Sequence, residues 1–424
     1  MQPSRTRYRA STFLFLLAGV TYLDRVCIST LAPEISRDLG LSKLQMSFVF
    51  SSFAVAYAAF EIVSAWWGEK IGARRVLTRI VVWWSAFTMA TAGAWNYFSL
   101  LVIRFLFGAG EAGAWPNAAL AFSRWIPLRE RGRVQGFFFA AAHVSGGLTP
   151  LLVTALLAWV PWRGIFIICG FAGLAWCAAW YRWFRDEPRD HRAVNPAELH
   201  LIESTRRIGG HKHHGRDLWV ALASSPNVWC LCLAYLSNSY GAYFVMTWLP
   251  TYLAENRGFE KQSLSLFAGL PLLLSVFGDI SGGAVTDWAS RIFGLRLGRV
   301  AVAVAGYAVA ALAMFAAVYA VTPMMAACLI AVAVAASMFT LSPSWAACMD
   351  IGGDNTAVLS AAMNTTGQVG SILSPVITGW IVYRFADWQM PLLIMGGLYS
   401  ASAVLWTFVD PRRRLDAKTH PPAG

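Results

Sequence analysis

The sequence predicts an all-α membrane protein with twelve transmembrane helices in two six-helix bundles. Of its 424 residues, 57% are hydrophobic and only 13% are charged, whereas charged residues make up about 25% of a typical soluble domain. The apolar residues fall in runs of about 20, the length that a helix needs to cross the hydrocarbon core of a bilayer. Strands of a membrane barrel would instead alternate in polarity over about 10 residues.

Twelve apolar runs follow one another along the chain. The first carries Asp24 and Arg25 and has no small-residue cleavage site, so we expect a retained helix rather than a signal peptide. The predicted spans are 10–31, 44–67, 77–95, 98–123, 134–159, 164–184, 227–254, 262–289, 300–320, 324–345, 357–383 and 388–409.

One long polar segment separates the sixth and seventh runs. It divides the chain into a bundle at 1–184, a cytoplasmic linker at 185–226 and a bundle with a cytoplasmic tail at 227–424. Within the linker we expect one surface helix at 196–207. Two similar six-helix halves are the arrangement of transporters that rock about a central site.

A short acidic and basic motif recurs after the second span of each half. Glu69 and Arg75 belong to the first copy and Asp287 to the second. An acid at the membrane edge can bridge to basic loops, so we expect these residues to control gating rather than to bind substrate. Glu61 and Asp279 lie deeper but near the same end, and Asp279 is assigned to the gate.

The net charge of +12 is concentrated in alternate connections between the spans. This positive-inside pattern places both termini in the cytoplasm. Because topology explains the basic loops, no nucleic-acid partner is expected. The seven cysteines lie in apolar runs without a C-x-x-C pair, so neither disulfides nor a metal site is predicted. The flexible cluster of His211, His213 and His214 lacks fixed ligand spacing.

Four charged residues inside the predicted spans are candidate functional groups, because burying a charge in a bilayer is costly. Asp24 lies about 21 Å along the first span, past the middle of a core roughly 30 Å thick. Arg25 points about 100° away from it, so each residue needs another partner. The alternative role for this pair is purely structural.

Arg104 and Glu111 lie on one face of the fourth span, about 10.5 Å apart. They are too far apart to bond directly but can share a cavity with a ligand or with the first span. Glu111 is therefore a candidate proton carrier, whose protonation would change as an anion arrives or leaves. The guanidiniums of Arg25 and Arg104 suit a carboxylate ligand. The alternative is helix–helix pairing.

Uncharged polar residues mark possible cavity positions in other spans. His143 could line a cavity or serve packing. Tyr240 in span seven, with Asn364 and Gln368 in span eleven, could bind the hydroxyls of a polyol. Such groups also often tie membrane helices together.

Five stretches of the sequence resemble the major facilitator superfamily, and more narrowly its anion:cation symporter branch. They are residues 22–25, 32–35, 104–117, 186–199 and 247–253. The resemblance covers nearly the whole chain and implies the major facilitator fold, acting as a monomer in a bacterial inner membrane. Glu69 departs from the Asp that is usual in the first gating motif, and Glu61 and His143 stand where neutral or small residues are usual.

The resemblance implies proton-coupled import of a small carboxylate such as a sugar acid, by alternating access. Asp24 and Glu111 match the proton-handling acids, and Arg25, Arg104, Tyr22 and Gln368 match positions near the substrate. H⁺ is the coupling ion and no cofactor is expected. An exporter or antiporter of the same fold is the alternative. A membrane enzyme is not expected, because no H-E-x-x-H, G-x-S-x-G or comparable motif occurs.

Overall fold

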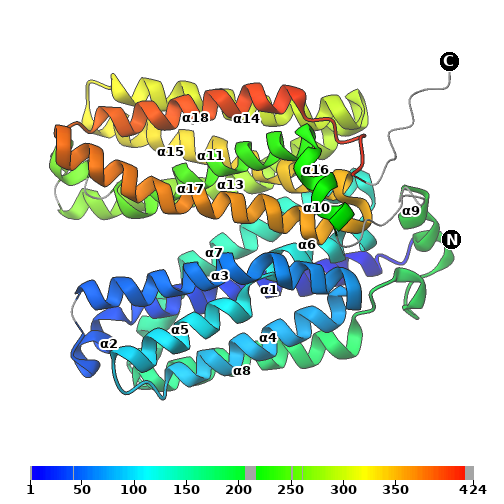
Figure 1. The fold of residues 1–424 in the computed structure, drawn as a ribbon, viewed down its shortest axis with the longest axis horizontal. Helices are drawn as coiled ribbons and strands as arrows, with labels where there is room; N and C mark the ends of the chain where they lie inside the picture. Colours follow the sequence, from blue (N-terminus) through cyan, green and yellow to red (C-terminus); the bar gives the residue numbers. More distant parts are fainter. Residues whose placement is uncertain (1, 42, 206–215, 250–251, 260, 416–424) are drawn as a thin grey trace. The chain divides into compact units, whose positions relative to one another are not determined.

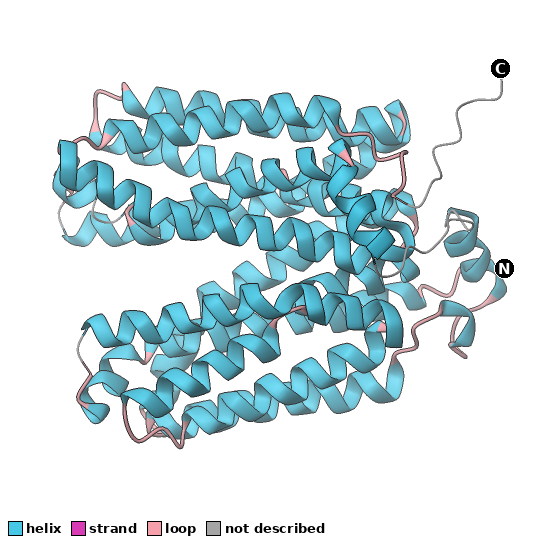
Figure 2. Ribbon diagram, viewed as in Figure 1, coloured by secondary structure: helices cyan, strands magenta, loops and turns pink. Residues whose placement is uncertain are grey.

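In the part of the chain that it describes, the computed structural model consists of helices joined by loops, with no strand (Figures 1 and 2). The described residues are 2–41, 43–205, 216–249, 252–259 and 261–415. The linker histidines His211, His213 and His214 lie outside these ranges.

Tertiary contacts group the chain into two units. The first comprises Met1–Pro127 and Ala141–Arg207, and the second comprises Leu128–Ala140 and Ile208–Gly424. One helix, α7 (Arg131–Leu157), contributes to both units. The sequence predicts a different kind of division, into consecutive segments at 1–184, 185–226 and 227–424. That division stays a prediction.

The first unit is a bundle in which α3 packs on α5 and α4 packs on α8 (Figure 1). Its buried core includes Leu31, Leu100 and Phe166. The elements are α1 (Thr6–Thr30), α2 (Ala32–Leu39), α3 (Lys43–Ile71), α4 (Ala73–Thr91), α5 (Tyr97–Glu111), α6 (Ala114–Trp125), the end of α7, α8 (Trp162–Trp183), a 3₁₀ turn at Pro188–Asp190 and α9 (Pro196–Thr205).

The second unit packs α11 against α17 and α13 against α15. Alanine and glycine are abundant in these helices, and such small residues let membrane helices approach closely. The elements are a 3₁₀ turn at Leu128–Glu130, the start of α7, α10 (Arg216–Ser224), α11 (Pro226–Thr247), a π-helical turn at Tyr252–Asn256, α13 (Lys261–Phe293), α14 (Leu295–Val318), α15 (Pro323–Phe339), α16 (Leu341–Gly352), a 3₁₀ turn at Gly353–Asn355, α17 (Thr356–Phe385) and α18 (Gln389–Phe408).

Seven helical stretches of the described residues are long and apolar enough to cross a membrane. An eighth is added if α10 and α11, which meet at 69°, count as one span. Each of the twelve predicted spans coincides with a described helix or a pair of helices. The predicted linker helix is found as α9, and the short helices α2 and α10 were not predicted.

Two predicted spans are each broken into two helices. The fourth breaks between α5 and α6, where Gly113 has a φ of 89°, and the tenth breaks at Thr340 between α15 and α16. Pro116 and Pro343 are the third residues of α6 and α16. Proline lacks an N–H and disfavours helical backbone before it, but it is tolerated in a first turn. The continuous helices expected from hydrophobicity are therefore divided just before each proline.

Candidate functional site

Close packing of α5 on α3 positions the charged residues of the fourth span. A Cβ atom added to Gly108 would lie 2.5 Å from the carbonyl oxygen of Phe53, so only glycine permits this approach. Glu111 is the last residue of α5 and is fully buried. The helix breaks directly after Glu111, and its carboxylate lies inside the first unit.

Arg25 of α1 and Glu111 of α5 form a buried ion pair. The Arg25 Nε donates to the Glu111 Oε1 over 2.5 Å. The guanidinium carbon also lies 4.9 Å from the centre of the Tyr57 ring and 5.1 Å from that of Phe53, distances at which a cation and an aromatic face attract each other. Glu111 is therefore paired with a residue of α1, which is the first predicted span.

Asp24 and Arg104 complete a group that we call the charged cluster: Asp24, Arg25, Arg104 and Glu111. Asp24 is only 1% exposed, and neither of its carboxylate oxygens has a hydrogen-bond partner among the described residues. Arg104 acts electrostatically on both Asp24 and Glu111. Two acids and two arginines balance in charge, while several of their polar atoms remain available for hydrogen bonds.

Tyr22 and His143 lie next to each other beside the charged cluster. Their ring centres are 5.9 Å apart and their planes are nearly perpendicular. Tyr22 also lies 5.8 Å from the Arg25 guanidinium. The sequence reasoning missed Tyr57, which is 2% exposed and whose hydroxyl has no hydrogen-bond partner among the described residues. Its position one helical turn before Glu61 was the available signal.

The predicted polar residues of the second unit are only partly brought together. Asn364 of α17 accepts a hydrogen bond of 3.3 Å from the hydroxyl of Tyr235, which in turn accepts one of 3.3 Å from the Trp345 indole. Neither Tyr235 nor Trp345 was predicted. Gln368 lies one turn beyond Asn364, and the buried Tyr240 lies about 7.5 Å further along α11 than Tyr235.

Asp287, a predicted gate residue, holds the start of α7 within the second unit. Its carboxylate accepts hydrogen bonds from the backbone N–H groups of Gly132, over 2.9 Å, and Arg133, over 2.7 Å. Arg299 approaches the same carboxylate at 3.6 Å. Asp279 is buried, and its carbonyl oxygen accepts a hydrogen bond from Ser342.

A second acid, Asp350, extends this network and was not predicted. It binds Arg131 over 2.7 Å and Arg299 over 3.3 Å. In the first unit, the predicted gate residue Glu69 is buried whereas Arg75 is exposed. The acids of the two copies of the gating motif, Glu69 and Asp287, are therefore both buried.

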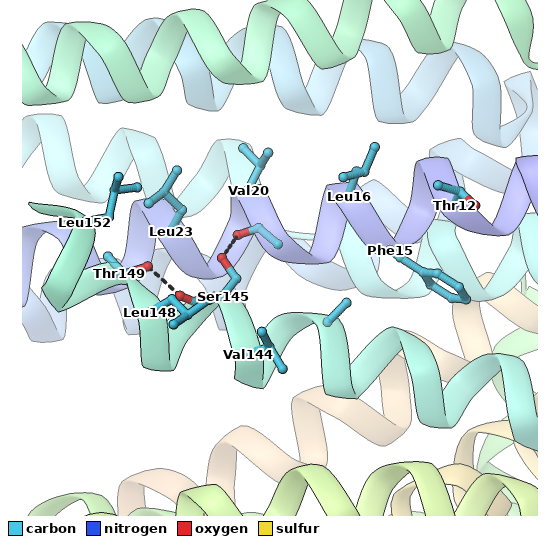
Figure 3. A pocket seen from close by; sticks show the side chains of 12 residues that line it. Thr12, Phe15, Leu16, Val20, Leu23, Val144, Ser145, Leu148, Thr149 and Leu152 are labelled. Carbon is cyan, nitrogen blue, oxygen red and sulfur yellow. Dashed lines mark hydrogen bonds between the residues drawn. The ribbon is translucent and has the colours of Figure 1, made fainter.

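The first unit also contains an apolar cavity of about 530 Å³ between α1 and α7 (Figure 3). No charged side chain lines it, and its hydroxyls are already engaged. Ser145 donates to the Gly19 carbonyl oxygen over 2.7 Å, and Thr149 donates to the Ser145 carbonyl oxygen over 2.7 Å. This cavity therefore has no group that could bind an anion and does not coincide with the charged cluster.

Residues 14–375 match the Major Facilitator Superfamily. The chain belongs to this family. The probable sulfoacetate transporter SauU of Cupriavidus necator is 32% identical to it, and the match covers 98% of this chain and 96% of SauU. The hexuronate transporter of Bacillus subtilis is 28% identical, with 96% of both chains covered. The probable galactarate/D-glucarate transporter GarP of Escherichia coli K12 is 28% identical, with 95% and 94% covered.

Two solved structures share the fold. The proton:xylose symporter XylE has a TM-score of 0.73 at 16% identity, covering 97% of this chain and 98% of XylE. The E. coli fucose:proton symporter FucP has a TM-score of 0.74 at 14% identity, covering 95% and 99%. The predicted fold class and the predicted resemblance to the anion transporter branch are confirmed. This major facilitator protein is a membrane-spanning transporter and not an enzyme.

Proposed function

We propose that this transporter is a proton-coupled symporter that imports a small organic anion, a sugar acid or another carboxylate, by alternating access. The observation that carries the proposal is the buried charged cluster of the first unit. There Glu111 pairs with Arg25, and Asp24 has two carboxylate oxygens without a hydrogen-bond partner among the described residues. Acids kept in a membrane-spanning unit without full pairing are typical of proton pathways.

In the proposed mechanism, Arg25 changes its partner: it is paired with Glu111 before Glu111 takes up a proton, and with the substrate anion afterwards. Protonation of Glu111 weakens its ion pair with Arg25, because the pair then loses one of its charges. The Arg25 guanidinium can next bind the substrate carboxylate through two parallel hydrogen bonds. Asp24 accepts a proton in the same way beside Arg104. The loaded site is then nearly neutral, which lowers the cost of moving it through the membrane.

The relatives support the class of substrate. SauU, the hexuronate transporter and GarP are named for sulfoacetate, hexuronates and galactarate or glucarate, all of which are organic anions. The arginines of the charged cluster would bind the anionic group. Asn364, Gln368 and Tyr240 offer hydrogen bonds for hydroxyl groups, and Tyr22 and His143 offer a ring surface and a further polar group.

The cellular setting is part of the proposal. We place the protein as a monomer in the bacterial inner membrane, with both termini in the cytoplasm, because the basic residues concentrate in alternate connections. A fluorescent protein fused to the C-terminus would fold and emit only on the cytoplasmic side. A fusion that is exported and dark, while an N-terminal fusion emits, contradicts this orientation.

Uptake into proteoliposomes tests the function. The purified protein is supplied with a panel of radiolabelled anions, including hexuronates, galactarate, glucarate and sulfoacetate, with and without an inward proton gradient. We expect one or more of them to accumulate only with the gradient. Glu111→Gln should abolish accumulation yet retain exchange of labelled for unlabelled substrate. Accumulation by Glu111→Gln equal to that of the parent, or substrate expulsion driven by inward protons, overturns the proposal; expulsion would indicate an antiporter.

A further inference from the structure

A basic cavity of about 530 Å³ lies at the C-terminal end of α8, where the membrane-spanning stretch Trp162–Trp183 ends. Three arginines and one aspartate line it, together with a tryptophan and a histidine, so positive charge is in excess. The lining residues are Arg182, Trp183, Arg185, Asp190, His191 and Arg192. An excess of positive charge in a concave site favours an anion.

The walls of this cavity are fixed by contacts within the first unit. Arg185 folds back on the end of α8, where its Nη1 donates to the carbonyl oxygens of Arg182, over 3.0 Å, and Phe184, over 2.8 Å. The Trp183 ring lies 4.6 Å from that of His191, and Trp125 donates to the Arg185 carbonyl oxygen over 2.9 Å. The cavity is therefore formed before any ligand arrives.

Two of the arginines are available to a ligand. Arg182 and Arg192 are exposed, and neither guanidinium forms a hydrogen bond or an ion pair with any described residue. A guanidinium presents paired N–H groups that match two oxygens of a phosphate. His191 accepts a hydrogen bond at Nδ1 from the Ala193 N–H over 3.2 Å. Burial lowers the pKa of His191, and the nearby Arg185 does so as well, which favours the neutral imidazole.

Arg182 also ends an exposed apolar stripe on α8. Exposed residues recur at 168, 171, 175, 178 and 182, a spacing that keeps them on one helix face. Ile168 and Phe171 are large and apolar, and Phe171 is 60% exposed. A helix face of this kind in a membrane protein contacts acyl chains, and its ends lie at the level of the lipid headgroups.

We infer that this cavity binds the phosphate of an anionic phospholipid, with the acyl chains lying along the exposed stripe of α8. Arg182 and Arg192 would hold the phosphate oxygens, and Trp183 would form the wall at the headgroup level. Basic pockets beside membrane helices are known to bind anionic headgroups. The site is separate from the charged cluster, and the inference does not depend on which anion is transported.

Native mass spectrometry of the detergent-purified full chain tests the inference. The protein is titrated with phosphatidylglycerol and, separately, with the zwitterionic phosphatidylcholine. We expect tighter binding of phosphatidylglycerol, weakened by about 25-fold in the double variant Arg182→Gln/Arg192→Gln, since each arginine near an anionic lipid surface contributes a factor of about 5. The matched control is Arg189→Gln, an arginine of the same loop that does not line the cavity, and it should bind as the parent does.

Two further measurements test lipid binding independently of the titration and of the folding of the double variant. Phosphatidylglycerol should raise the unfolding midpoint of the parent and of Arg189→Gln but not that of the double variant. If the double variant does not fold, Arg192→Gln alone, in an exposed loop position, should weaken binding about 5-fold. Equal binding of phosphatidylglycerol by the parent and these variants overturns the inference. Displacement of the lipid by soluble glycerol phosphate at a similar concentration also overturns it, because the site would then be a free phosphate site.

Discussion

The Nε of Arg25 lies 2.5 Å from the Oε1 of Glu111, and this is a one-sided contact. The second carboxylate oxygen of Glu111 and the Nη2 of Arg25 have no hydrogen-bond partner among the described residues. A carboxylate and a guanidinium can form two parallel hydrogen bonds, so half of this pairing capacity is unused. The free N–H groups of Arg25 are where a substrate carboxylate could begin to bind before Glu111 is released.

This geometry predicts that lysine cannot replace Arg25. Arg25→Lys keeps the positive charge but loses the planar guanidinium, so it should pair with Glu111 and yet bind the substrate poorly. Loss of a charged hydrogen bond corresponds to about 10-fold or more in KM for uptake. Arg163→Lys is the control, since Arg163 contacts Asp38 and the Ala94 carbonyl oxygen and not the charged cluster. A KM for Arg25→Lys close to that of the parent is inconsistent with the proposed role.

Asp24 should show opposite effects on stability and on transport. Its buried carboxylate has no hydrogen-bond partner among the described residues, so Asp24→Asn removes a buried charge that is costly to keep there. We expect the unfolding midpoint in detergent to stay the same or rise, while proton-driven accumulation falls.

Asp287→Asn is the contrasting variant for this measurement. Its carboxylate accepts two backbone N–H hydrogen bonds, so this substitution should destabilise the protein by about 1–3 kcal/mol. If Asp24→Asn lowers the midpoint as much as Asp287→Asn does, Asp24 has a structural role instead.

The sequence was sufficient to predict the long apolar helices and the four charges of the charged cluster, because both depend on composition along a single segment. Hydrophobic runs of about 20 residues located the spans, and Asp24, Arg25, Arg104 and Glu111 were conspicuous as charges within them. Their burial follows from position along a helix. Their pairing does not, since it depends on which helices become neighbours.

Features that arise from contacts between distant segments were missed. Arg131 and Asp350 are 219 residues apart in the chain, and no local pattern links them. For Tyr57 the one local signal was its position a helical turn before Glu61, and it is packing that places its ring against Arg25. The break at Gly113 was missed because hydrophobicity continues through it, although the proline at position 116 was a usable signal.

Gly113 should tolerate no side chain. Its φ of 89° belongs to a conformation that costs other residues about 1–2 kcal/mol, and an added Cβ would collide with the Ser64 side chain. Gly113→Ala should therefore lower the unfolding midpoint and disturb Glu111 at the end of α5. Gly147→Ala is the control, since no atom beyond its chain neighbours and its own helix backbone lies within 4 Å of its added Cβ and alanine favours a helix. Equal midpoints for the two variants would falsify this account of the helix break.

Glu198 of α9 should make stability depend on pH, because it caps the N-terminus of α1. Its carboxylate accepts hydrogen bonds from the backbone N–H groups of Thr6, over 2.8 Å, and Arg7, over 3.2 Å, and from the Ser4 hydroxyl over 2.5 Å. The Arg7 guanidinium lies 3.0 Å away. Burial alone would raise the pKa of Glu198, but these donors outweigh burial and hold its pKa below the ordinary value of 4.5.

A lowered pKa means that the unfolded chain binds the proton more tightly than the folded chain does. The stabilisation is therefore complete above about pH 4.5 and is lost as the pH falls through the lower pKa of the folded state. Glu198→Gln should unfold at a lower temperature than the parent at pH 7. The difference between the two unfolding temperatures should shrink as the pH falls below about 4.5. The matched control is Glu203→Gln on the same helix. Among the described residues its carboxylate contacts only the exposed Arg189, at 3.5 Å, so this variant should follow the parent at every pH. A constant difference between Glu198→Gln and the parent from pH 7 to pH 3.5 shows that the carboxylate charge does not stabilise the start of α1.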